Sequence, residues 1–235
     1  MRLGNHLYIL TFVFILSFAG SIRSQNPHNS PTYGIKGGIL LSTIDGDNVI
    51  DPYAKIIMPQ IGITGALFFS PKISINSELN FEIKGGNFDG YELKTSLNYI
   101  SIPLFAKFAF SKDPEIYVYG GGYGSYLLSA KTTGTYEKFE VNEKINEDIK
   151  PNLSAFDAGF IAGVGVQGRF NRKADIFLDF RYCQGLINID NGTVDNRYNL
   201  SNGDTRLNVN ELPPEKALNK SFMLTTGMYF YIIKR

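Results

Sequence analysis

The sequence predicts an all-β fold, an eight-stranded antiparallel up-and-down barrel, and two observations support this prediction. Eight segments alternate apolar residues with polar residues or glycine, and a period of two is the period of a β-strand. The connections between these segments alternate between short and long. The predicted strands span residues 32–43, 57–69, 72–86, 93–110, 115–131, 154–170, 174–188 and 220–233.

The alternation is clearest in the third segment, KISINSELNFEIKG. One side of this strand is apolar and carries Ile73, Ile75, Leu79, Phe81 and Ile83. The other side is polar and carries Ser74, Asn76, Glu78, Asn80, Glu82 and Lys84. The sixth and seventh segments repeat this pattern on either side of a polar turn at residues 171–173, which predicts a β-hairpin with two chemically different faces.

The connections are sorted by length. Strands two and three are joined by residues 70–71, strands four and five by 111–114, and strands six and seven by 171–173. The other connections are longer, and the last runs from Ile189 to Asn219. Because successive strands are antiparallel, all short turns lie at one end of the barrel. Short periplasmic turns opposite long extracellular loops are typical of a transmembrane barrel of the outer membrane.

The connection from Glu137 to Lys150 is rich in charge. We interpret it as a solvated loop, and the alternative is one short helix.

The volume of the barrel indicates which face meets lipid. Side chains alone fill the interior of an eight-stranded barrel, so the bulky Phe, Ile and Leu residues must face outward. The opposite face combines glycines, which leave room for long side chains from the far wall, with five charges of each sign. Buried charges are tolerated only when they are paired. We therefore predict that an ion-pair network fills the lumen and leaves no continuous water channel. Its predicted members are Lys36, Glu78, Glu82, Lys84, Lys107, Asp157, Arg169, Asp175, Asp179 and Arg181.

Two other folds fit the alternation alone. A two-layer sandwich would place the charges on a solvated face, and a soluble periplasmic lipid-binding barrel would turn the apolar face inward. The last strand favours the membrane barrel. Its polar Thr225, followed by Gly227, Phe230 and Ile232, resembles the C-terminal signal that the barrel-assembly machinery recognises.

The N-terminus predicts export. Arg2 precedes an apolar stretch from Leu7 to Ala19 and then small residues, which is the pattern of a cleaved signal peptide. We expect a signal peptide at residues 1–24, a short periplasmic lead at 25–31 and the barrel domain at 32–235. The alternative is a retained N-terminal anchor. The net charge of +1 predicts no nucleic-acid partner.

The sequence predicts no catalytic residue, no cofactor and no metal site. Its two histidines, His6 and His28, precede the barrel, which excludes Ser-His mechanisms and histidine metal sites within it. Asp157 and Asp179 could form a hydrolytic pair, but ion pairing with Arg169 and Arg181 explains them more simply. Cys183 is expected to be a buried, inert thiol in the lumen. Three aspartates of the last loop lack the spacing of a calcium loop, namely Asp190, Asp195 and Asp204.

Several blocks resemble the PorT-like outer-membrane β-barrel family of Bacteroidetes. They are YGIKGGILLS, SELNFEIKGG, LNYISIPLFAKF and LDFRYCQGLINI, and the resemblance spans about Tyr33 to Phe230. The most specific pieces are Asn98 to Leu104 and Arg181 to Leu186. The resemblance implies an eight-stranded barrel in the outer membrane of a Gram-negative cell and, for the namesake of the family, a part in type IX secretion.

We expect a non-enzymatic, porin-like barrel whose long loops serve as an interaction surface, especially Thr132 to Asn152 and Ile189 to Asn219. Alternatives are a component of type IX secretion and a small solute channel or transporter. The expected partners are outer-membrane lipids, the barrel-assembly machinery during biogenesis, and surface or secretion-system proteins that bind the loops. The sequence leaves the oligomeric state open.

Overall fold

The computed structural model describes residues 31–46, 55–88, 92–138, 141–171, 173–191 and 217–231. The predicted signal peptide, most of the predicted periplasmic lead and most of the last loop lie outside these residues, as do Asp195 and Asp204. Within the described part of the chain, no helix has the length and apolar character needed to cross a membrane.

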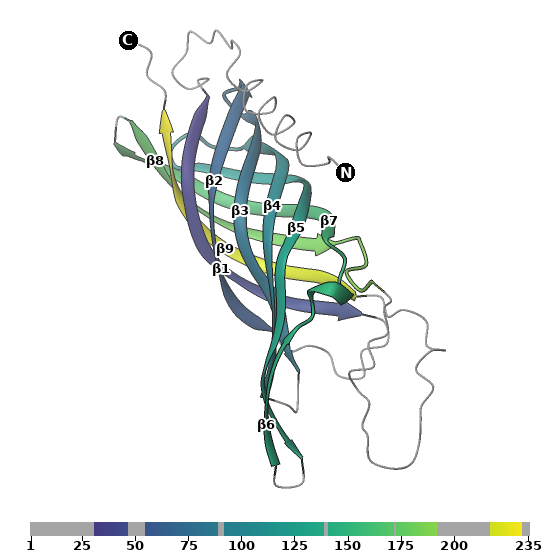
Figure 1. The fold of residues 1–235 in the computed structure, drawn as a ribbon. Coiled ribbons are helices and arrows are strands. Elements are labelled where there is room, and N and C mark those ends of the chain that lie inside the picture. Colours follow the sequence, from purple (N-terminus) through teal and green to yellow (C-terminus); the bar gives the residue numbers. More distant parts are fainter. Residues whose placement is uncertain are drawn as a thin grey trace, which may run out of the picture.

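Eight long strands close into an antiparallel barrel (Figure 1). Around the ring the order is β4-β3-β2-β1-β9-β8-β7-β5, and the pairing of β4 with β5 closes it. This confirms the predicted eight-stranded barrel. The barrel strands are β1 (Thr32–Gly46), β2 (Ile56–Ser70), β3 (Ile73–Phe88), β4 (Glu92–Ala109), β5 (Glu115–Lys138), β7 (Phe156–Asn171), β8 (Ala174–Gly185) and β9 (Ala217–Tyr231).

The first and last barrel strands meet edge to edge. β1 pairs with β9 from Thr32↔Tyr231 to Gly46↔Ala217. Ring closure therefore leaves no free edge in the barrel wall, which is a requirement for a sheet in lipid because hydrocarbon offers backbone groups no hydrogen bonds. The β2–β3, β4–β5 and β7–β8 turns are short and lie together at the upper end of the barrel in Figure 1.

The segment predicted as a loop or a short helix is a β-hairpin, so that prediction was wrong. β5 continues beyond the ring to Lys138, and β6 (Val141–Asp148) pairs back along it from Lys138↔Val141 to Lys131↔Asp148. A 3-10 helix, η2 (Lys150–Asn152), leads into β7. The charges of this segment indicate solvent exposure, but they do not prevent strand pairing, because backbone hydrogen bonds stabilise the ladder whichever side chains it carries.

The outer and inner faces differ as the alternation predicts. Along the middle of β4, Ile100, Ile102 and Leu104 are exposed on the wall, whereas Tyr99 and Ser101 are buried inside. On β7, Phe156, Phe160 and Val164 are likewise exposed. An apolar wall around a polar, buried interior is the arrangement of a barrel surrounded by lipid.

Candidate functional site

The lumen is the candidate site, and Glu78 is at its centre. Both terminal guanidinium nitrogens of Arg181 donate to this carboxylate, Nη1 to Oε2 at 2.7 Å and Nη2 to Oε1 at 2.8 Å. Lys36 Nζ donates to the same Oε2 at 2.7 Å. Glu78 is on β3 and Arg181 is on β8, four places away in a ring of eight. This bidentate pair therefore joins opposite walls across the lumen.

Tyr119 extends the central network. Arg181 Nε donates to its hydroxyl at 2.9 Å, and the hydroxyl donates to Asp179 Oδ1 at 2.9 Å. The guanidinium carbon also lies 5.1 Å from the ring centroids of Phe105 and Tyr119. A delocalised cation between aromatic faces loses less on burial than an isolated one.

A second group of polar side chains lies nearer the loop end of the lumen, around Asp157. Its Oδ2 lies 3.4 Å from Lys84 Nζ and accepts hydrogen bonds from Tyr123 Oη at 3.2 Å and Asn219 Nδ2 at 2.9 Å. Lys84 Nζ also lies 3.6 Å from Glu82 Oε2 and 4.6 Å from the Tyr123 ring centroid. This group joins β3, β5, β7 and β9.

A third group lies near the short-turn end. Lys107 Nζ donates to Glu115 Oε1 at 2.9 Å and to Gln167 Oε1 at 3.1 Å. Gln167 Nε2 in turn donates to Asp175 Oδ2 at 2.9 Å, and Tyr231 donates to the same carboxylate. Gln167 is thus a neutral bridge between a lysine and an aspartate.

The structure brings nine of the ten predicted lumen residues inside the barrel. Their exposed fractions range from 1% to 8%. The positions follow from strand alternation, but the partners differ from those expected: Asp157 meets Lys84, and Asp179 meets Tyr119.

Arg169 is the exception, and its inclusion in the network was wrong. Its side chain is exposed at the short-turn rim. It lies at the end of β7, where the register against β8 shifts between Arg169 and Asn171. Arg169 keeps the regular register opposite the buried Asp175, and the register shifts only after it. Alternation therefore still assigns Arg169 to the inner side, but the wall ends there and the side chain is exposed to solvent.

Three tyrosines of β5 are lumen residues that the sequence interpretation missed. Each lies directly opposite a glycine of β7 in the strand register. The pairs are Tyr117↔Gly165, Tyr119↔Gly163 and Tyr123↔Gly159. A Cβ atom on Gly165 would lie 2.5 Å from Cζ of Tyr117.

These glycines therefore accommodate rings from the neighbouring strand. The sequence analysis expected them to leave room for long side chains from the far wall, and that expectation was wrong. The sequence could have revealed them. Like Glu115, the tyrosines occupy odd-numbered positions of β5, and they alternate with the outward-facing Ile116 and Val118.

An apolar layer closes the loop end of the lumen. Ile189 is 1% exposed and packs in a buried cluster with Leu97, Tyr99 and Leu127. Backbone hydrogen bonds hold its segment in place, from Ser154 N to Ile189 O at 2.8 Å and from Ile189 N to Ala217 O at 2.9 Å. The base of the last loop thus covers the charged groups below it.

This arrangement is suited to holding the walls together. Among residues 31–46, 55–88, 92–138, 141–171, 173–191 and 217–231 there is no histidine, and no group of three or more His, Cys, Asp or Glu side chains could hold a metal. Cys183 is a free thiol, buried in the lumen. Asp157 and Asp179, considered above as a hydrolytic pair, lie in separate hydrogen-bonded groups.

A closed ring of eight antiparallel strands with an apolar wall and a buried polar interior defines a small transmembrane β-barrel. Residues 23–191 match the family model for the outer membrane protein beta-barrel domain. The chain belongs to this family, and it is an integral protein of the outer membrane.

Several solved structures are similar to this chain. Ail, the attachment invasion locus protein of Yersinia pestis, is 12% identical with a TM-score of 0.41, and the match covers 86% of this chain and 99% of that chain. OprG of Pseudomonas aeruginosa is 12% identical with a TM-score of 0.48, covering 87% and 98%. Neisserial surface protein A is 10% identical with a TM-score of 0.47, covering 85% and 97%. No curated protein sequence matches.

Proposed function

We propose that this protein is a non-enzymatic outer-membrane barrel whose extracellular segments bind a partner protein at the cell surface. The observation that carries the proposal is the β5–β6 hairpin, which projects beyond the barrel at the end opposite the short turns (Figure 1). A binding segment on a rigid scaffold loses less conformational entropy on association than a free loop does.

The hairpin is anchored at its base. β5 is continuous from the membrane wall into the hairpin, and β4 pairs with it as far as Glu92↔Thr135. On the return side, Ile149 N donates to Ala130 O at 3.1 Å and Lys150 Nζ donates to Leu128 O at 2.8 Å. These bonds support a fixed direction for the hairpin relative to the barrel.

Replacing residues 134–145 with a two-residue Asn-Gly turn, which then joins the paired residues Thr133 and Asn146, tests the proposal. The barrel is expected to fold and to keep its heat-modifiable migration on gels, because the lumen contacts of Glu78, Asp157 and Lys107 do not involve these residues. A photo-crosslinking amino acid at Thr133 should capture a discrete partner on living cells, and the shortened variant should lose it. The same crosslinker at Leu178, on the lipid-facing wall, is the matched control. Equal capture from both positions would contradict the proposal.

Within the outer-membrane family we propose that the chain belongs to the PorT-like branch, and a part in type IX secretion is the second candidate function. The resemblance in the blocks Asn98 to Leu104 and Arg181 to Leu186 supports it. Deletion of the gene in its native host should then block export of surface proteins. Normal export would exclude this function while leaving the partner-binding proposal intact.

We predict that the protein does not conduct ions. The Glu78–Arg181 pair joins opposite walls, and the cluster around Ile189 covers the loop end. Purified protein in a planar bilayer should therefore show no stable conductance steps, with a general porin as the positive control in the same bilayer. Reproducible unitary steps would instead favour the small channel or transporter.

A further inference from the structure

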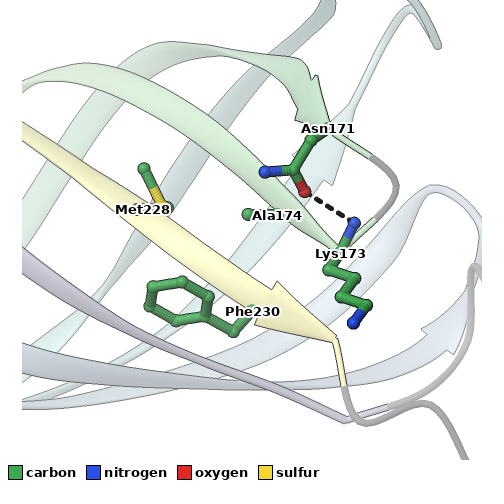
Figure 2. Close-up of a pocket in the computed structure, with 5 residues that line it drawn as sticks. All are labelled: Asn171, Lys173, Ala174, Met228 and Phe230. Carbon is green, nitrogen blue, oxygen red and sulfur yellow. Dashed lines mark hydrogen bonds between the residues drawn. The ribbon is translucent and has the colours of Figure 1, made fainter.

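The outer wall contains a groove close to the short-turn end. Asn171, Lys173, Ala174, Met228 and Phe230 line it, as Figure 2 shows. Its volume is about 490 Å³, and it is wide open, so it offers a shallow surface for an extended chain and not an enclosed pocket.

The groove lies where a small residue, Ala174, stands beside the larger Met228 and Phe230. Ala174 is on the outward side of β8, in the same alternation as Ile176 and Leu178, which are 40% and 48% exposed. Ala174 is only 2% exposed, because Phe230 lies opposite it in the strand register and the β7–β8 turn adjoins it. The small Ala174 side chain thus lies beneath its larger neighbours, at a shallow hollow in the lipid-facing wall.

Polar groups flank the groove at its rim. The backbone N–H of Lys173 donates to Asn171 Oδ1 at 2.8 Å. This bond sets the orientation of the Asn171 amide, so that its Nδ2 points away from Lys173 and over the groove (Figure 2). The ammonium of Lys173 lies beyond the end of β9, on the side away from Met228 (Figure 2). A donor and a cation thus flank an apolar floor.

We propose that this groove binds one phospholipid of the periplasmic leaflet, with an acyl chain against Met228 and Phe230 and an anionic phosphate headgroup at Lys173 and Asn171. The short turns are periplasmic, so the rim lies at the level of phospholipid headgroups. An acyl chain matches the apolar floor, and a phosphate oxygen accepts from both an amide and an ammonium.

Charge at this end of the barrel favours an anionic lipid. Among the described side chains of the short-turn end, four exposed ones are cationic, namely Lys72, Lys112, Arg169 and Lys173. One exposed side chain there, Asp113, is anionic. A basic surface beside a bilayer attracts anionic headgroups, and one lysine changes the affinity about fivefold.

Photolabelling tests the proposal on the full mature protein in phosphatidylcholine vesicles. The probe is a trace of phosphatidylglycerol with a diazirine in one acyl chain, and a phosphatidylcholine probe of the same chain serves for comparison. Label from the phosphatidylglycerol probe is expected to concentrate at Met228 and Phe230. Ala174→Leu fills the groove and should lower this labelling at least fivefold, whereas Ala162→Leu, at an exposed wall position on β7, should not.

Lysine variants separate the headgroup contact from general attraction to the membrane. Lys173→Glu should lower labelling by phosphatidylglycerol about fivefold or more and leave phosphatidylcholine labelling nearly unchanged. Lys72→Glu, in the β2–β3 turn, should have little effect. Even labelling around the wall, or no effect of Ala174→Leu, would overturn the site. Equal losses in the two lysine variants would overturn the headgroup contact. Heat-modifiable migration verifies that every variant is folded.

Discussion

Glu78→Gln is expected to lower the free energy of unfolding by about 3–5 kcal/mol, the cost of removing one partner from a buried ion pair. Glutamine preserves the shape of the side chain, but it leaves Lys36 and Arg181 without the carboxylate that both now contact. Both cations contact one oxygen, Oε2, so the substitution leaves two neighbouring buried cations without a direct carboxylate partner. Asp179, which reaches Arg181 through the Tyr119 hydroxyl, compensates them only in part. Urea unfolding in lipid vesicles measures the effect.

Two further variants show whether the loss comes from this pair. Arg181→Met should destabilise less than Glu78→Gln, because Lys36 still neutralises Glu78. Asp45→Asn removes a carboxylate from an exposed ion pair with Lys220, and it should cost about 1 kcal/mol or less. If Glu78→Gln proves as mild as Asp45→Asn, the central pair does not hold the walls together.

Gly165→Ala is expected to destabilise the barrel by about 1–3 kcal/mol, the usual cost of adding a methyl group to a packed interior. The new Cβ would lie 2.5 Å from both Cζ and Oη of Tyr117. The ring must therefore move, and it would leave its position 4.4 Å from the Lys107 ammonium. The same unfolding measurement detects the change.

The control substitution is in the same strand. A Cβ atom on Gly168 would have no heavy atom within 4 Å beyond its chain neighbours, so Gly168→Ala should change stability by less than about 0.5 kcal/mol. A double-mutant cycle then assigns the cause. In a Tyr117→Ala background, Gly165→Ala should cost almost nothing. An unchanged cost in that background would mean that backbone strain, and not the ring, makes the glycine necessary.

Strand alternation predicted the barrel well because the membrane imposes it. Each strand residue faces either lipid or the narrow lumen. Because successive side chains point to opposite faces of a strand, alternate residues fall into these two environments. This is why Lys84 and Asp157 could be placed inside from their positions alone. The same rule failed at Arg169, where the strand reaches the rim and the lumen ends, and beyond the membrane at β6, where neither environment acts on the chain.

Other parts of the site depended on neighbours that the sequence does not reveal. The tyrosines of β5 were overlooked because an aromatic ring is compatible with either face, and only the opposing glycines of β7 make room for it inside. The groove at Ala174 is a further case, since a single alanine becomes a hollow only when Phe230 and Lys173 stand beside it.

By itself, the sequence determined that the chain forms eight membrane strands, which side of most strands faces lipid, and nine of the charges that are buried. The tertiary structure decided which of those charges meet. Glu78 contacts Arg181 across 103 residues of sequence because ring closure places β3 opposite β8 and strand stagger brings the two side chains to the same height. Alternation is a local property of each strand, whereas ring closure and stagger are properties of the whole sheet.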